Sequence, residues 1–199
     1  IAERLKAADV PVAMAIGFDP TRIASGVPSN VDLFINLYQG TNIIGGGAAR
    51  PAADFGGRLI NVDLRERREI IHVTLDKNDA IHELIVRKIG ALAERERAIR
   101  NAAAVPLQDA HSSARDRRKP QRQAAAQDEP LYVTPIAIRY VVPPRQTIEL
   151  WDSAIQVQAS ANDTVDQVAQ RTGAPGWAIA QINKVDAGQP LREGQRLLV

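Results

Sequence analysis

The 199-residue sequence predicts two kinds of structure in one chain, an α/β region with a parallel sheet and a small α+β module at the C-terminal end. Two observations predict the α/β region. Residues 10–18 form an almost unbroken apolar run, typical of a strand buried on both faces of a parallel sheet, and a long amphipathic helix pattern follows residue 78. One observation predicts the module: residues 155–199 contain two strand patterns that flank two helical patterns.

The N-terminal region, residues 1–99, contains several strand patterns and one well-defined helix. The strand patterns lie at residues 10–18, 29–38 and 58–64. The second of them alternates apolar with polar or aromatic side chains. A helix is expected to begin near Asn78 or Asp79, because an apolar stripe runs from Ile81 to Leu92 at helical spacing. This set of elements predicts the α/β class for the region.

The composition changes in the middle of the chain. Residues 100–130 contain almost no large apolar side chains, so we expect a disordered linker there. The basic cluster from Arg115 to Lys119 is interpreted as part of this solvated linker. Residues 131–152 alternate apolar and polar side chains again, and we expect an extended segment that supports the C-terminal domain, residues 153–199.

Composition and charge exclude several kinds of site and partner. The chain has no cysteine, which rules out disulfides and thiolate metal sites. The formal net charge is only +2, and the basic excess lies in the linker and the segment after it, so we expect no nucleic-acid partner. No apolar run is long enough to span a membrane. Because residues 1–9 already read as part of a helix, we expect a piece of a longer or processed protein.

The C-terminal stretch is organised by turn and cap residues. The strand patterns lie at residues 155–159 and 196–199. Cap residues precede a first helical pattern that starts at Val165, and Gly173 followed by Pro175 ends that pattern. A second short helical pattern ends near Asn183, and glycine and proline turns lead from it to the last strand.

This arrangement resembles the LysM domain over residues 155–199. The matching positions are Asp163, Thr164, Val165, Val168, Ala169, Gly173, Ile182, Asn183, Leu191 and the run Gly194-Gln195-Arg196-Leu197. They cover the whole module at the family's spacing. The sequence departs from the family pattern at Asn162, where Gly is usual, at Val165, where Leu is usual, and in lacking a Pro after the last strand. The first departure is mild, because Asn tolerates positive φ better than most residues.

The resemblance implies binding of N-acetylglucosamine-containing polymers, peptidoglycan or chitin, in a shallow groove between two loops. Carried over by position, the implied carbohydrate-binding residues are Asn162, Asp163, Thr164, Val165, Ile182, Asn183, Lys184 and Val185. Such a groove needs amide and backbone hydrogen bonds with a small apolar seat, and neither cofactor nor metal. The implied partner is peptidoglycan, and the implied location is the bacterial cell envelope, periplasmic or extracellular.

Two alternatives stay open for these residues. In the first, Asp163 and Thr164 only cap a helix and Asn183 only closes one, without any contact to sugar. In the second, the module binds protein and the chain is a scaffold.

The N-terminal region resembles the C-terminal third of an α/β-hydrolase in its order of helix, buried strand, Asp, strand, His and helix. The resemblance implies that Asp19 is the triad acid and His72 the general base, because a serine hydroxyl reacts only after an imidazole takes its proton. No Gly-x-Ser-x-Gly motif occurs, so the chain as given is not expected to be a competent enzyme. The alternative function is a serine esterase, lipase or thioesterase whose nucleophile lies upstream of Ile1.

Simpler interpretations apply to the same residues. Asp19 precedes a proline, which is common in turns, and a single histidine such as His72 is more often structural than catalytic. His72, His82 and Asp76 form too weak a pattern to predict a metal site. The glycine-rich stretch at residues 45–47 is interpreted as a flexible loop, because no Gly-Lys-Ser/Thr follows it.

Overall fold

The structure is a computed structural model that describes residues 1–20, 26–41, 47–103, 131–132, 136–151 and 155–199. Of these residues, those up to 84 and those from 131 onward belong to one compact unit, and residues 85–103 belong to a second. Most of the linker expected at residues 100–130 lies outside the described residues. Within the described part of the chain, no helix combines the length and the apolar character that crossing a membrane requires.

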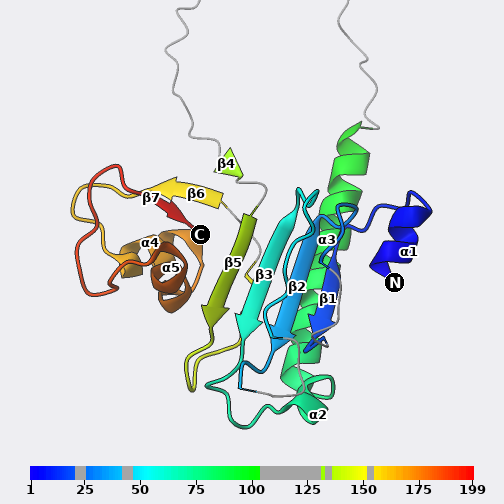
Figure 1. Cartoon of the computed structure of the whole chain (residues 1–199). Coiled ribbons are helices and arrows are strands. Elements are labelled where there is room, and N and C mark those ends of the chain that lie inside the picture. The colour runs from blue at the N-terminus through cyan, green and yellow to red at the C-terminus, as the bar shows by residue number, and fades with distance from the viewer. Residues whose placement is uncertain (21–25, 42–46, 104–130, 133–135, 152–154) are drawn as a thin grey trace, which may run out of the picture. The chain divides into compact units, whose positions relative to one another are not determined.

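The first unit contains a four-stranded sheet in which every pair of neighbours is parallel (Figure 1). The strands, in their order across the sheet, are β1 (Ala15–Phe18), β2 (Leu33–Tyr38), β3 (Arg58–Asp63) and β5 (Ile136–Val141). The predicted α/β class is thus confirmed. The two central strands are almost entirely buried, as expected for a parallel sheet.

Strand β1 corrects the expectation of a strand buried on both faces. Only residues 15–18 of the apolar run form a strand, and all of them are half-buried. Among the described strands, β1 pairs only with β2, so it lies at an edge of the sheet. Before it, Val12 makes only an isolated bridge to Val31. An apolar run therefore predicted the strand's existence here but not its place in the sheet.

Strand β5 adds to the expectation for residues 131–152. Residues 131–132 pair with residues 155–156 of the C-terminal domain, as a support segment would, and residues 136–141 also pair along the whole length of β3, from Arg58 opposite Ile136 to Asp63 opposite Val141. The alternation of apolar and polar side chains is that of a strand, with Ile136, Ile138 and Tyr140 on one face. The expected linker therefore connects two parts of the same sheet and does not separate the sheet from the C-terminal domain.

Three helices accompany the N-terminal strands. They are α1 (Ala2–Ala7), α2 (His72–Leu75) and α3 (Asp79–Ala103). As predicted, Asn78 caps α3, since its Oδ1 accepts a hydrogen bond of 3.1 Å from the N–H of Ile81. The helix runs four residues past the expected boundary at residue 99, through sequence rich in good helix formers. The predicted apolar stripe of this helix is buried at its start, where Ile81 is fully buried. Further along the helix it is not, because Ile89 is 52% exposed.

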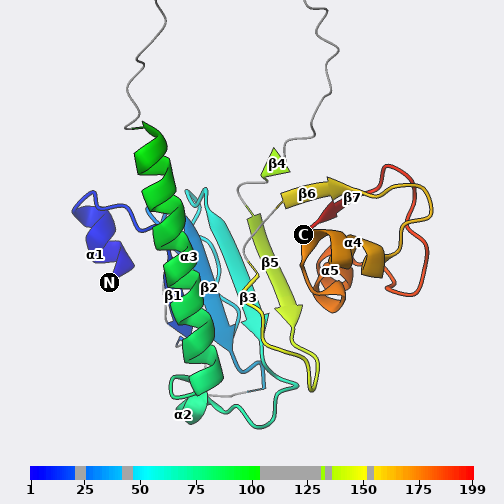
Figure 2. The ribbon, with the colours of Figure 1, turned by 180° about the vertical axis from the view of Figure 1, so that it is seen from behind.

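The C-terminal domain consists of a small antiparallel sheet and two helices (Figure 2). Its elements are β6 (Ile155–Gln158), α4 (Val165–Thr172), α5 (Gly176–Asn183) and β7 (Arg196–Leu198), and β4 (Leu131–Tyr132) adds a third strand beside β6. The predicted order of strand, helix, helix and strand is confirmed. Its core contains Ala159, Val165, Val168, Ile179, Leu191, Leu197 and Val199.

Candidate functional site

The loop between β6 and α4 is organised by Asp163. The side-chain oxygen Oδ2 of Asp163 accepts hydrogen bonds from the N–H of Ser160 at 2.8 Å and from Arg171 at 2.9 Å. The carbonyl oxygen of Asp163 accepts a third bond, of 2.7 Å, from the N–H of Leu191. Because Leu191 belongs to the segment between α5 and β7, this bond joins the two loops that the sequence predicts to form a groove.

The pKa of Asp163 reflects these contacts. The hydrogen bond from Arg171, and then the one from the Ser160 N–H, hold the pKa of this carboxyl below its usual range. Asp163 is therefore an anion that is already engaged by the protein. It shapes the loop, and the residue as a whole is buried.

Of the other predicted residues of the first loop, some stabilise the fold and others are accessible at the surface. Asn162 is exposed and has a φ of 64°, the left-handed conformation that explains why Gly is acceptable at this position in the family pattern. Thr164 caps α4 in a capping box with Gln167, as predicted. Val165 is fully buried in the core. Asn162 and the half-buried Thr164 are thus the two predicted contacts that a ligand can reach in this loop.

The second loop is held by Asn183. Its Nδ2 donates to the carbonyl oxygens of Ile179 and Leu198, both at 2.8 Å, and its Oδ1 accepts from the N–H of Leu198 at 2.7 Å. Both N–H groups of the amide are used, so Asn183 ties the end of α5 to β7. The structure assigns it a role in the fold, as the simpler interpretation of the sequence held.

The remaining positions of the second loop are more accessible. Lys184 is exposed and ends α5 in the left-handed conformation, with a φ of 55°. Ile182 and Val185 are half-buried, and Val185 packs against the core of the domain. The structure thus brings the two predicted loops together and leaves Asn162 and Lys184 exposed, with Thr164, Ile182 and Val185 half-buried.

The residues implied by the hydrolase resemblance lie in the parallel sheet. Asp19 directly follows β1, is 3% exposed, has a φ of 41° and donates its backbone N–H to the Leu37 carbonyl at 2.7 Å. His72 is the first residue of α2, and its side chain lies outside the described residues. Strand β2 lies between β1 and β3, so Asp19 and His72 do not follow neighbouring strands. Such strained backbone at a strand end is a feature of functional sites, although it identifies no reaction.

The described residues hold no cluster of three or more potential metal ligands. The Nε2 atom of His82 lies 2.6 Å from the backbone oxygen of Asp76, a contact that holds the histidine against its own helix start.

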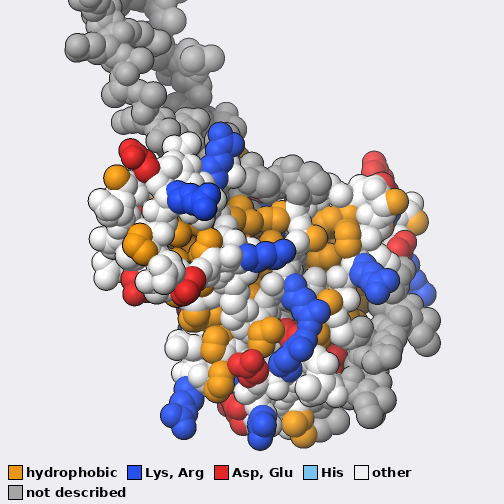
Figure 3. Space-filling view, turned by 60° about the vertical axis from the view of Figure 1, so that its left-hand side comes forward, with side chains coloured by type: hydrophobic (Ala, Val, Ile, Leu, Met, Phe, Trp, Pro, Cys, Tyr) orange, Lys and Arg blue, Asp and Glu red, His pale blue; other side chains and the backbone are white. Residues whose placement is uncertain are grey.

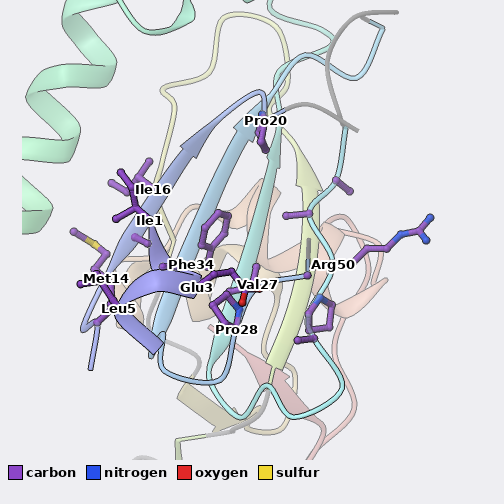
Figure 4. Close-up of a pocket in the computed structure, with 18 of the residues that line it drawn as sticks. Ile1, Glu3, Leu5, Met14, Ile16, Pro20, Val27, Pro28, Phe34 and Arg50 are labelled. Carbon is purple, nitrogen blue, oxygen red and sulfur yellow. The ribbon is translucent and has the colours of Figure 1, made fainter. Parts of the chain in front are cut away.

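A hollow of ≈ 1150 Å³ runs along the edge strand β1 (Figure 4). Its lining is mostly apolar and includes Leu5, Met14, Ile16, Val27 and Phe34. Because Ala15 and Ile16 point to opposite faces of the sheet and both line the hollow, it passes around the edge of β1.

Sequence reasoning missed a charged cluster at the carboxyl ends of the central strands. Asp63, the last residue of β3, is fully buried and contacts Tyr38, Arg65 and Arg139. One sequence feature does point to this cluster: Asp63 is an aspartate at the end of a buried strand pattern. Parallel sheets bind their ligands at this end of their strands. No sequence pattern predicts that Arg139, 76 residues further along the chain, pairs with Asp63.

Comparison with known proteins found no matching family model, no similar curated protein and no similar solved structure.

Proposed function

We propose that residues 155–199 form a LysM module that binds N-acetylglucosamine-containing polymer, and that the protein is held on peptidoglycan in the cell envelope. The observation that carries the proposal is the hydrogen bond from the Leu191 N–H to the Asp163 carbonyl, which joins the two loops of the expected groove. The sequence resemblance and the order of strand, helix, helix and strand support the same proposal.

Some loop residues fix the backbone and others remain accessible, an arrangement that is compatible with sugar binding. Asp163 and Asn183 fix the two loop backbones, and Val165 anchors the first loop in the core. The exposed amide of Asn162 and the half-buried apolar side chain of Ile182 are the kind of surface that an N-acetyl group requires. A single groove of this size is expected to bind weakly, since avidity in such modules comes from repeats.

The test is sedimentation of the whole chain with insoluble peptidoglycan. The double variant Asn162→Gly, Ile182→Ala removes an amide and part of the apolar seat while keeping the left-handed conformation at residue 162. We expect its retention to fall about tenfold, as loss of ~1.4 kcal/mol of binding requires. Gln170→Ala, on the exposed surface of α4, is the matched control and should be retained like the wild type.

Equal retention of the double variant and the wild type would overturn the proposal. It would favour the scaffold alternative, in which the module binds protein. Because the two variants leave Asn183 and Asp163 intact, a thermal melt should show that both remain folded, so lost retention reports binding.

A second function is supported by a separate observation. Asp19 is buried at the carboxyl end of a parallel strand in a left-handed backbone conformation, where the hydrolase resemblance implies a triad acid. This supports a serine ester hydrolase in which His72 is the general base and preceding sequence supplies the nucleophile. The test is fluorophosphonate labelling and ester hydrolysis by the protein with its preceding sequence, where His72→Gln should abolish both. Unchanged ester hydrolysis in that variant would remove the hydrolase proposal.

A further inference from the structure

The charged cluster at the carboxyl ends of β2 and β3, to which Arg139 of β5 contributes, converges on one oxygen atom. Oδ2 of Asp63 accepts hydrogen bonds from the Tyr38 hydroxyl at 3.1 Å, from Arg65 Nε at 2.8 Å and from Arg139 Nη2 at 2.7 Å. Arg65 Nη2 bonds the same oxygen, and the Arg65 N–H bonds Oδ1 at 3.0 Å. The two guanidinium groups are therefore held side by side.

The cluster carries more positive than negative charge. Two arginines share a single carboxylate, and among the described residues the ion pairs of both are with Asp63. The side chains of Arg65 and Arg139 are 39% and 47% exposed, while that of Asp63 is fully buried. One positive charge is thus left at the surface, beside a buried counter-ion that keeps both guanidiniums in place.

The guanidinium of Arg139 has N–H groups beyond the one that bonds Asp63. It bonds Asp63 through Nη2, and its central carbon lies 5.6 Å from the centre of the Tyr38 ring. A guanidinium has five N–H groups in a planar fork that matches the oxygens of phosphate and carboxylate. Because the side chain is 47% exposed, the other N–H groups of Arg139 are accessible to such a ligand.

The site is also rigid and well placed. Gly40, two residues after β2, lies so close to the carboxylate that an added Cβ would be 2.5 Å from Asp63 Oδ1. The backbone therefore packs directly against Asp63 and fixes it. Open α/β sheets bind ligands outside the carboxyl ends of their strands. Tyr38 and Asp63 are the paired last residues of β2 and β3, and Arg139, opposite Asn61, reaches Asp63 from β5. Figure 3 shows Lys and Arg side chains spread over the face that it presents, some of them near its middle.

We propose that Arg65 and Arg139 form a binding site for a small oxoanion, a phosphate or carboxylate group. Asp63 holds the two guanidiniums next to each other through its Oδ2 atom, and the ligand supplies the second negative charge that the pair lacks. The anion is either free in solution or part of a larger molecule, since both present the same oxygens. The proposal is independent of glycan binding by residues 155–199.

The test is a titration of the whole chain with inorganic phosphate at constant ionic strength, with sodium chloride as the balancing salt. In wild-type protein we expect saturable shifts of the Nε–Hε resonances of Arg65 and Arg139. The affinity of Arg139→Gln should be lower by about tenfold, the loss of one charge-assisted bond. Arg192→Gln removes an exposed arginine of the C-terminal domain and should leave the affinity unchanged.

Two further experiments test the role of the guanidinium fork and the kind of anion that binds. Arg139→Lys keeps the charge but loses the planar fork, so a several-fold weaker affinity is expected for it. Titration with glycerol phosphate and with acetate distinguishes a phosphate ester from a carboxylate. The proposal is overturned if the Arg65 and Arg139 resonances shift linearly without saturation, or if they shift no more than that of Arg192. The resonance shifts of the wild-type protein test the proposal even if a variant is unstable.

Discussion

The side-chain amide of Gln181 on α5 forms two hydrogen bonds with the backbone of Val141 on β5. Oε1 accepts from the Val141 N–H at 3.0 Å, and Nε2 donates to the Val141 carbonyl at 2.9 Å. The amide thus takes the place of a neighbouring strand at this point of the sheet edge. Four residues earlier, Trp177 packs edge to face against Tyr140, with ring centres 5.7 Å apart. These contacts dock the C-terminal domain directly on the edge strand.

Replacing Gln181 with Met should weaken this docking. The change keeps the side-chain volume and helix propensity but removes both hydrogen bonds. We expect the free energy of unfolding to fall by about 1–2 kcal/mol, because the site is exposed and water replaces part of the loss. Urea unfolding measures the loss, and faster amide exchange at Val141 locates it. Gln170→Met on α4 is the control, and unchanged exchange at Val141 would contradict the interpretation.

Asn183 should behave as a structural residue and not as a sugar contact. Asn183→Ala removes three hydrogen bonds and leaves the backbone of Leu198 on β7 without its partner. We expect a loss of about 3 kcal/mol of unfolding free energy, one for each hydrogen bond. Lys184→Asn, at the adjacent left-handed position, should be nearly neutral. Full stability of Asn183→Ala together with lost glycan retention would show that the assignment is wrong.

The local signals of the C-terminal domain were predictable from the sequence because each acts over a few residues. Thr164 caps the helix that follows it, and Gly173 ends that helix with a φ of 74°. The two strands were expected close to their observed bounds, since alternation and glycine turns define them. The family assignment and the sugar stay predictions.

The parts that sequence reasoning missed depend on pairing between distant residues. Strand β5 begins at Ile136 and pairs with β3, which ends at Asp63, and no local pattern states which edge it joins. Asn183 was expected to face a ligand, because its bonds to Leu198 only become visible once β7 is placed. The ion pair between Asp63 and Arg139 follows from the same long-range register.

Asn162 tests whether the backbone of the first loop is left-handed. Its φ of 64° is costly for most side chains and most of all for a β-branched one. Asn162→Val should lower the free energy of unfolding by about 1–2 kcal/mol, whereas Asn162→Gly should be neutral or slightly stabilising. Chemical denaturation of both variants checks this. Equal stability of the two would mean that residue 162 adopts an ordinary negative φ.

The ion pairs of the buried Asp63 carboxylate with two partly exposed arginines predict a loss of stability in acid. Burial by itself would raise the pKa of Asp63, but the hydrogen bonds from Arg65 and Arg139 outweigh it and hold the pKa below its usual range. Burial raises the pKa of Tyr38 far above its usual value, so the tyrosine remains a donor to Asp63 throughout. The unfolded chain therefore binds a proton at this carboxyl more readily than the folded chain does.

The sign of the effect follows from that difference. The contribution of Asp63 is complete above the pKa of about 3.9 expected in the unfolded chain, and it disappears as the pH falls through the lower folded value. Asp63→Asn should lower the free energy of unfolding by about 3 kcal/mol near neutral pH, since it leaves two adjacent guanidiniums without their counter-ion. It should also flatten the acid limb of the pH profile, measured by urea unfolding. Asp54→Asn, which breaks the exposed pair with Lys6, is the control. It should change the profile only slightly and less at high salt, and an equal effect of the two variants would contradict the assigned role of Asp63.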